Sequence, residues 1–458
     1  MDLASREGSL RRARGYLPVL LVGAVCLLQC ERLVAFTLKY AVNILFWDQW
    51  DFYTPFFERA SLWRMFEWQH GPPRLGIGSV FAWFLAGLTH WNSRSDALAF
   101  VGIVTVATLL AVRLKRRLFG PLALTDVVIP LLLLSRLQYE MIVGATDLSH
   151  GAFPVLLTLL ICLGWLQPNR LIRYGLVLTV NFLMIFTGFG LFMGLITPAL
   201  LALDCYRAMR AGRRAALAGG VLALGVALLS SAAFFIGYVF VTGAVTFTPF
   251  RFPYGSGLAY PWYAGLMFAN AFGLKFYHRV VASVVGIAVL IGVAGTLIHH
   301  ARLMLRSEGE ADNRSRIIAI LLGYSLLFVL ATAVGRVQVG PYSADSSRYY
   351  PYVAIGILGL YFHLLTVRRT GLRKWGLRLS LLGAAVAGLH LTALDEGTIA
   401  RLSNGKRRWR SCYLRTEDIK GCDKAAGFMI YPRPEATRLK EKLDYLKREK
   451  LNLYAPDP

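Results

Sequence analysis

Long apolar runs separated by short arginine-rich segments are the feature that most constrains this chain. The first run extends from about position 16 to position 41 and follows an N-terminal segment with several arginines. A run of about 20 apolar residues is long enough to cross a bilayer as a helix. Because lipid offers the backbone no hydrogen-bond partner, a chain with many such runs crosses the membrane as helices. The sequence therefore predicts an all-α polytopic membrane protein.

The lysine and arginine clusters between the runs predict the topology. Short cytoplasmic loops carry an excess of these residues, and about eleven spans place every dense cluster among the short loops on one side. With a cytoplasmic N-terminus, the expected spans lie near 16–41, 97–112, 124–135, 152–166, 176–186, 191–203, 215–241, 280–298, 317–334, a segment ending near 365, and 377–394. The alternative is ten spans with the C-terminal tail inside.

Composition agrees with this class of protein. Of 458 residues, 56% are hydrophobic and only 17% are charged, and the mean hydropathy is +0.51. A net charge of +24 would suit a nucleic-acid partner if the basic residues formed one patch or stripe. They instead occur in clusters between apolar runs, so we expect a membrane partner and no nucleic acid.

The chain divides into a transmembrane domain at 1–394 and a small C-terminal periplasmic segment at 395–458. The first periplasmic loop, 46–96, contains an apolar run at 75–91 that is short for a span, and counting it would place the next basic cluster outside. We therefore expect interfacial helices there. A long loop at 247–279, rich in proline, glycine and aromatic residues, is expected to be a structured surface loop.

The C-terminal segment has two further features. Leu439, Leu443, Leu446 and Leu451 recur near helical spacing and predict a helix. Cys412 and Cys422 would form a disulfide on an oxidising side of the membrane, and otherwise would be two free thiols.

Polar side chains gather on the predicted periplasmic side. A carboxylate there could deprotonate a hydroxyl while fixed guanidinium groups stabilise a departing phosphate. The candidates are Asp48 and Asp51 as catalytic carboxylates, Arg336, Arg348 and Arg74 as phosphate-binding groups, and His70, Glu140, Asp147, His150 and Tyr349 as substrate-binding or supporting residues.

Asp48 and Asp51 are three residues apart. They share a face if their segment is helical and diverge if it is extended. On a shared face they would repel each other or hold a divalent metal ion, the one cofactor considered for this chain. Alternatively, Asp51 caps the helix that follows.

His70 precedes the rigid GPPR turn and is either functional or a hydrogen-bonded structural residue. Arg336 and Arg348 lie just beyond spans, in a loop where the topology bias disfavours arginine. Something local should therefore compensate each charge, unless both side chains extend to lipid headgroups.

Short motifs near both ends of the chain add a resemblance. They are WDQW at 47–50, QHGPPR at 69–74, GR at 335–336 with SRY at 347–349, and YPRP at 431–434. With an acidic motif in the first outer loop, they resemble the GT-C superfamily of polyprenyl-phosphate-sugar-dependent glycosyltransferases. More narrowly, they are similar to a family of bacterial membrane proteins with WDxW, QH...R and GR...SRY motifs. The chain departs from that pattern at 71–73, where GPP replaces an expected glutamate and second histidine.

The resemblance implies a GT-C-like fold in the bacterial inner membrane with a periplasmic active face. It implies transfer of a sugar from a polyprenyl-phosphate carrier to a periplasmic glycan, lipid or protein. Asp48 would be the general base, Asp51 would assist it or bind a metal, and Arg336 and Arg348 would hold the lipid phosphate. Two alternatives remain: a transporter or flippase for a lipid-linked glycan, and a non-catalytic subunit of an envelope glycan assembly complex.

Overall fold

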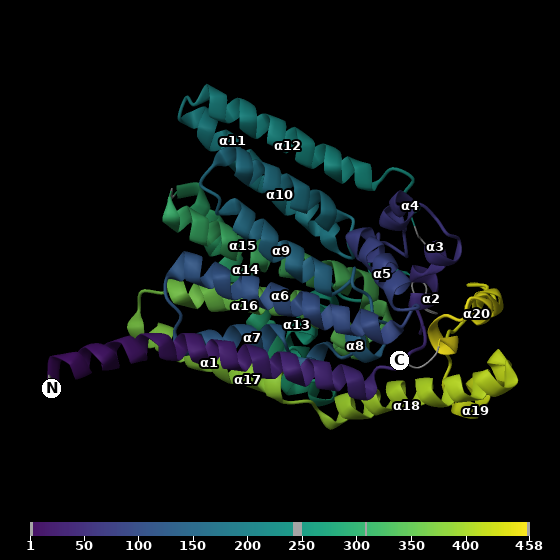
Figure 1. The fold of residues 1–458 in the computed structure, drawn as a ribbon. Coiled ribbons are helices and arrows are strands. Elements are labelled where there is room, and N and C mark those ends of the chain that lie inside the picture. Colours follow the sequence, from purple (N-terminus) through teal and green to yellow (C-terminus); the bar gives the residue numbers. More distant parts are fainter. Residues whose placement is uncertain (1–2, 241–249, 307–308, 456–458) are drawn as a thin grey trace.

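The computed structural model describes residues 3–240, 250–306 and 309–455. Helices make up 77% of the described residues, which form no strand beyond an isolated bridge between Gln69 and Arg74. The longest helices run side by side in a bundle, and short helices gather at one end of it (Figure 1). The fold is therefore all-α, as predicted.

The bundle consists of long helices, and the longer connections between them carry the short helices. The long helices are α1 (Leu3–Tyr40), α6 (Ser93–Phe119), α9 (Ala152–Trp165), α10 (Arg170–Ile185), α11 (Met193–Arg210), α12 (Arg214–Phe234), α14 (Arg279–Arg306), α15 (Glu310–Arg336), α16 (Tyr350–Thr366), α17 (Thr370–Leu389) and α18 (Ala393–Thr416). The shorter helices are α2 (Gln49–Phe52), α3 (Thr54–Phe57), α4 (Leu62–Glu67), α5 (Gly76–Leu88), α7 (Val128–Leu133), α8 (Glu140–Val143), α13 (Ala259–Asn270), α19 (Ile419–Ala426) and α20 (Leu439–Arg448).

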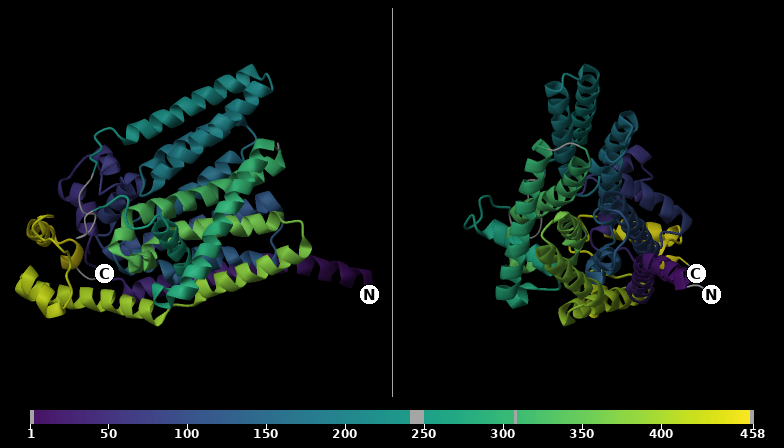
Figure 2. Two further views of the ribbon diagram at one scale, coloured as in Figure 1. Left: turned by 180° about the vertical axis from the view of Figure 1, so that it is seen from behind. Right: turned by 90° about the vertical axis from the view of Figure 1, so that its left-hand side faces the viewer.

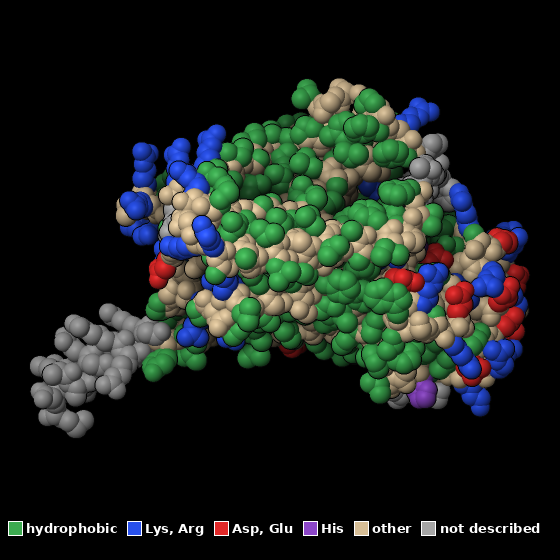
Figure 3. Space-filling model, turned by 90° about the horizontal axis from the view of Figure 1, so that it is seen from above, with side chains coloured by type: hydrophobic (Ala, Val, Ile, Leu, Met, Phe, Trp, Pro, Cys, Tyr) green, Lys and Arg blue, Asp and Glu red, His purple; other side chains and the backbone are tan. Residues whose placement is uncertain are grey.

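Seven segments of the described chain are long and apolar enough to cross a membrane. Many of their large apolar side chains are exposed, which a protein surrounded by water rarely tolerates over so wide a surface. Figure 3 shows hydrophobic side chains across the middle of one face and charged side chains at both ends. The chain is therefore a polytopic helical membrane protein.

The predicted count of about eleven spans stays a prediction. Each expected span coincides with a helix, but α7, α9, α10 and α16 have 17 residues or fewer. The end of the seventh expected span, at Val241, lies outside the described residues.

The segment expected to be a surface loop contains the buried helix α13, so that prediction is wrong for this part. α13 packs against α14 through two glycines, and a Cβ on Gly286 would lie 2.1 Å from the carbonyl oxygen of Gly265. Small residues let membrane helices approach this closely. α13 was not predicted as a helix of the bundle because its 12 residues are too few to cross a membrane.

Replacing Gly286 with alanine should therefore destabilise the bundle by roughly 1–3 kcal/mol, because two backbones must separate. The control is Gly292→Ala on the same helix, where an added Cβ meets open space. Thermal unfolding of both purified variants in detergent measures the effect. Equal midpoints would show that α13 and α14 do not meet at these glycines.

The first loop and the C-terminal tail form one unit, which we call the cap (residues 43–91 and 402–454). Its hydrophobic core combines Trp50, Phe56 and Met65 from the loop with side chains from the tail, including Trp409 and Leu443. The cap lies at the end of the bundle where α2–α5 and α18–α20 meet (Figures 1 and 2). The tail is therefore on the same side as the first loop, which disagrees with the ten-span alternative.

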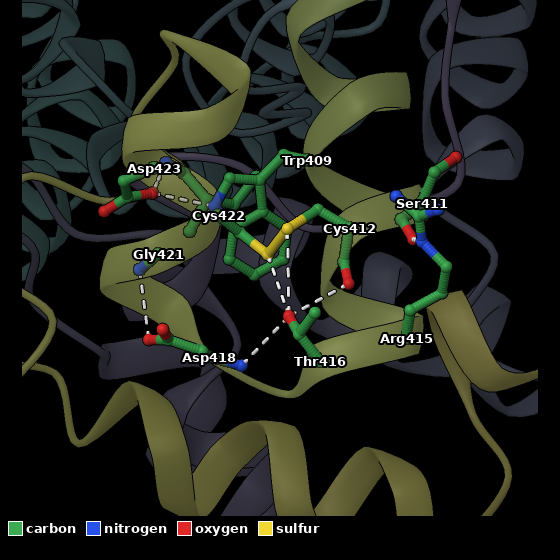
Figure 4. Close-up of a disulfide and its surroundings, with 10 residues drawn as sticks. Trp409, Ser411, Cys412, Arg415, Thr416, Asp418, Gly421, Cys422 and Asp423 are labelled. Atoms are coloured by element: carbon green, nitrogen blue, oxygen red, sulfur yellow. Dashed lines mark hydrogen bonds between the residues drawn. A yellow bond between two sulfur atoms is a disulfide. The ribbon is translucent and has the colours of Figure 1, made fainter.

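A disulfide joins α18 to α19 within the cap. Cys412 and Cys422 are bonded, with their Cα atoms 5.6 Å apart (Figure 4). Beside the bond, the indole nitrogen of Trp409 donates to Asp423 over 2.7 Å. The predicted tail helix is also present as α20, with Leu439, Leu443 and Leu446 fully buried.

Candidate functional site

Asp48 stands where the chain turns from α1 into the cap. The residue before it, Trp47, has a left-handed backbone with φ of 54°, and its amide donates to the carbonyl of Ile430 in the tail over 3.0 Å. Such a backbone is costly for a bulky residue and persists only where its surroundings hold it. The tail thus fixes the direction in which the Asp48 side chain leaves the backbone.

Four side chains from distant parts of the chain meet at this point, and we call them the Asp48 cluster: Asp48, His70, Glu140 and Arg348. One guanidinium nitrogen of Arg348 lies 3.8 Å from an oxygen of Asp48, and its Nε lies 3.6 Å from Glu140. The other Asp48 oxygen lies 3.9 Å from Nε2 of His70. The sequence predicted all four as candidates, and the structure brings them together.

The cluster is open to an incoming molecule. The side chains of Asp48 and Arg348 are 29% and 45% exposed. At 3.6–3.9 Å, the contacts are longer than good charge-assisted hydrogen bonds. Both groups therefore keep polar atoms available for a ligand.

Glu140 holds the loop that carries Arg348. Its carboxylate accepts hydrogen bonds from the hydroxyl of Ser346 at 2.5 Å and from the backbone amide of Arg348 at 3.2 Å. Its own amide donates to the hydroxyl of Ser347 over 2.9 Å. Desolvation lowers the pKa of Arg348, but the nearby carboxylates of Glu140 and Asp48 raise it more. The net pKa therefore lies above the ordinary value for arginine, and the side chain stays a cation. Glu140 is therefore a positioning residue. The sequence analysis did not identify its partners Ser346 and Ser347 as part of the site.

His70 is held by a tight turn. Its amide donates to the carbonyl of Pro73 over 3.0 Å, and Gly71 takes the positive φ that the turn needs. The ring packs edge-on against Phe52, with the ring centres 4.8 Å apart. The GPPR sequence thus positions His70 although it lacks the residues that the resembled family has there.

Arg74 is engaged elsewhere. Its guanidinium donates to the carbonyls of Phe234 and Ile236, over 2.9 and 2.6 Å, and to the carbonyl of Glu67. These carbonyls lie at the ends of α12 and α4, where a cation is favourable. With only 3% of its surface exposed, Arg74 anchors the His70 turn, and we do not place it among the phosphate-binding groups.

Asp51 also points away from the Asp48 cluster. One of its oxygens accepts from the hydroxyl of Tyr431 and the other from Thr437, both over 2.7 Å. Thr437 in turn accepts from the buried ammonium of Lys442 over 2.8 Å. Asp51 lies within α2, and Asp48 immediately precedes that helix. The side chain of Asp51 connects α2 to the tail and caps no helix.

Replacing Asp51 with alanine should loosen the tail, because it leaves the hydroxyls of Tyr431 and Thr437 without their acceptor. Losses of this kind cost about 1–3 kcal/mol. The expected result is faster cleavage of the tail in limited proteolysis. Glu58→Ala is the control, since its ion pair with Arg438 is exposed and should contribute little. Equal cleavage of the two variants would contradict the assigned role.

An aspartate–histidine pair lies behind Phe52. Asp147 contacts Nδ1 of His150 and accepts from the amide of Ser149 over 2.7 Å. The rings of Phe52 and His150 stack with centres 5.9 Å apart. Phe52 therefore lies between His150 and His70. His150 packs against Phe52, and neither His150 nor Asp147 is a member of the Asp48 cluster.

Arg336 and Tyr349 lie outside the Asp48 cluster. Arg336 ends α15 beside Tyr263 and forms no hydrogen bond or ion pair with any described residue. Tyr349 is only 6% exposed and packs near Phe328. Of the two predicted phosphate-binding arginines near spans, only Arg348 thus reaches Asp48.

The proposed metal does not fit these residues. Among the described residues, no group of three or more His, Cys, Asp or Glu side chains is arranged to hold a metal ion. Asp51 uses both oxygens to bind hydroxyl groups of the tail, so it does not share a ligand with Asp48.

Chemically, the Asp48 cluster offers a carboxylate within reach of a guanidinium and an imidazole, all partly exposed. Comparison of the chain with models of protein families finds no match, and comparison with curated protein sequences finds none either. The helices and their apolar surfaces identify the chain as a polytopic helical membrane protein.

Proposed function

We propose that the protein is a membrane glycosyltransferase of the GT-C type. It would move a sugar from a polyprenyl-phosphate carrier to a periplasmic glycan, lipid or protein. The observation that carries the proposal is the Asp48 carboxylate held 3.8 Å from the Arg348 guanidinium at one end of a membrane-embedded bundle. A base and a phosphate-binding cation side by side are the two groups that this transfer needs.

In the proposed reaction, Asp48 takes the proton from an acceptor hydroxyl. The hydroxyl oxygen then forms a bond to the anomeric carbon, while the bond between that carbon and the phosphate oxygen breaks. The electron pair leaves with the polyprenyl phosphate, whose negative charge Arg348 stabilises. Arg336 binds the same carrier at a greater distance from Asp48. His70 orients the Asp48 carboxylate. Because this is a single displacement, the anomeric configuration inverts.

Two observations support placing this end in the periplasm. The cap contains a disulfide, and disulfides persist in oxidising compartments. Lys and Arg gather at the opposite end, where Figure 3 shows few acidic side chains beside them, as the positive-inside bias predicts for the cytoplasmic side of the inner membrane.

The test is incubation of the purified protein in liposomes with a panel of polyprenyl-phosphate-sugars and periplasmic acceptors. A glycosyltransferase releases free polyprenyl phosphate in step with glycosylated acceptor. Recovery of every donor intact on the far side of the bilayer would instead favour the flippase alternative, and no reaction or movement would favour the non-catalytic subunit.

A further inference from the structure

A charged cavity lies at the end of the bundle opposite the cap. It has a volume of about 330 Å³ and opens between the starts of α10 and α12, the end of α11 and the start of α15. Its charged lining consists of Arg170, Arg173, Arg207, Arg213, Arg316, Asp204 and Asp312. Five arginines against two aspartates leave an excess of three positive charges.

The two aspartates are already neutralised at the floor of the cavity. Asp312 accepts from two nitrogens of Arg207, over 2.9 and 2.8 Å, and Asp204 accepts from Arg316 over 2.6 and 3.2 Å. Arg316 also lies over the ring of Trp165, 4.5 Å from its centre. These contacts fix the floor and leave no acidic group for the rim.

The rim carries the uncompensated charge. No described carboxylate lies within ion-pair distance of Arg170, Arg173 or Arg213. The Nε of Arg173 donates to the carbonyl of Gln167 over 2.9 Å, and its two terminal nitrogens form no hydrogen bond or ion pair with a described residue. The planar donor fork of an arginine matches the oxygens of a phosphate group.

We propose that this cavity binds a phosphate group, with Arg173 and Arg213 as its principal ligands. Its volume is at the small end of the range for ligand sites, which suits a phosphate ester with its substituent. Leu171, next in the chain to the cavity residue Arg170, is 83% exposed. The phosphate could therefore belong to a phospholipid whose acyl chains lie along Leu171, or to a soluble phosphate compound.

The test uses the full-length protein in detergent at constant ionic strength. Thermal unfolding is followed while adding inorganic phosphate, phosphatidylglycerol or zwitterionic phosphatidylcholine. Phosphatidylglycerol or phosphate should raise the unfolding midpoint, because a ligand that binds the folded state stabilises it. A rise with phosphatidylglycerol alone identifies a lipid headgroup, and a rise with inorganic phosphate as well identifies a site open to soluble phosphates.

The double variant Arg173→Gln with Arg213→Gln should weaken the apparent affinity by about tenfold or more, since charge-assisted hydrogen bonds are lost. The matched control is Arg368→Gln with Arg369→Gln, two exposed arginines in the connection between α16 and α17. Retention of the wild-type response in the first variant would overturn the proposal. An equal loss in both variants, or no response of the wild type to either anionic probe, would also overturn it.

Discussion

Replacing Asp48 with asparagine is expected to lower the turnover of sugar transfer by roughly 10²- to 10⁴-fold, the range that general-base catalysis contributes. The amide has nearly the shape of the carboxylate but cannot accept the hydroxyl proton. The contacts of Asp48 are partly exposed and long, so its loss should change stability little. A transfer assay on purified protein in liposomes measures the effect.

The matched control is Asp444→Asn, an exposed aspartate of the same cap that pairs with Lys440. It should transfer sugar at the wild-type rate. Near-normal turnover of the Asp48 variant would remove Asp48 from the role of base. Equal losses in both variants would show that the assay reports damage to the cap instead of loss of chemistry.

Replacing Arg348 with glutamine should lower kcat/KM for the donor by about 10²- to 10³-fold, the loss seen when one stabiliser of a developing anion is removed. Arg348→Lys should restore only part of this, because an ammonium cannot reproduce the two-pronged guanidinium contact. Steady-state rates across donor concentrations measure both variants.

Arg336→Ala provides the comparison for Arg348. Arg336 has no contact with Asp48, so its removal should weaken donor binding and raise KM with less effect on kcat. An unchanged response to donor concentration would exclude Arg336 from the phosphate site. An unchanged kcat/KM after Arg348→Gln would show that Arg348 does not stabilise the departing phosphate.

The class of fold could be predicted because lipid imposes a simple rule on sequence. A segment that faces lipid must be apolar for its whole length and must satisfy its own backbone hydrogen bonds, so the runs are visible without any structure. Helices such as α6 and α14 follow this rule. α13 does not, because it is short and buried between other helices.

The Asp48 cluster could be predicted in part. The residues were found because charged groups at a span end need a local reason, and Asp48 and Arg348 compensate each other. Their distance could not be predicted, since it depends on a loop held by Glu140 from a third segment.

Asp51 and Arg74 show what the sequence could not reveal. Their partners are hydroxyls and carbonyls supplied by the tail and by α12, and neither pairing has a periodicity or spacing that marks it. The shared hydrophobic core of the cap could not be predicted either, because it joins segments more than 300 positions apart in the sequence.

The proposed reaction is direct displacement of a phosphate-linked sugar by a hydroxyl that Asp48 activates. The anomeric configuration of the glycosylated acceptor, formed from a donor of known configuration, distinguishes this reaction from the alternatives. Inversion, with one polyprenyl phosphate released for each sugar transferred, is the predicted result. Retention of configuration, or recovery of the donor with its sugar still attached, would contradict the proposed reaction.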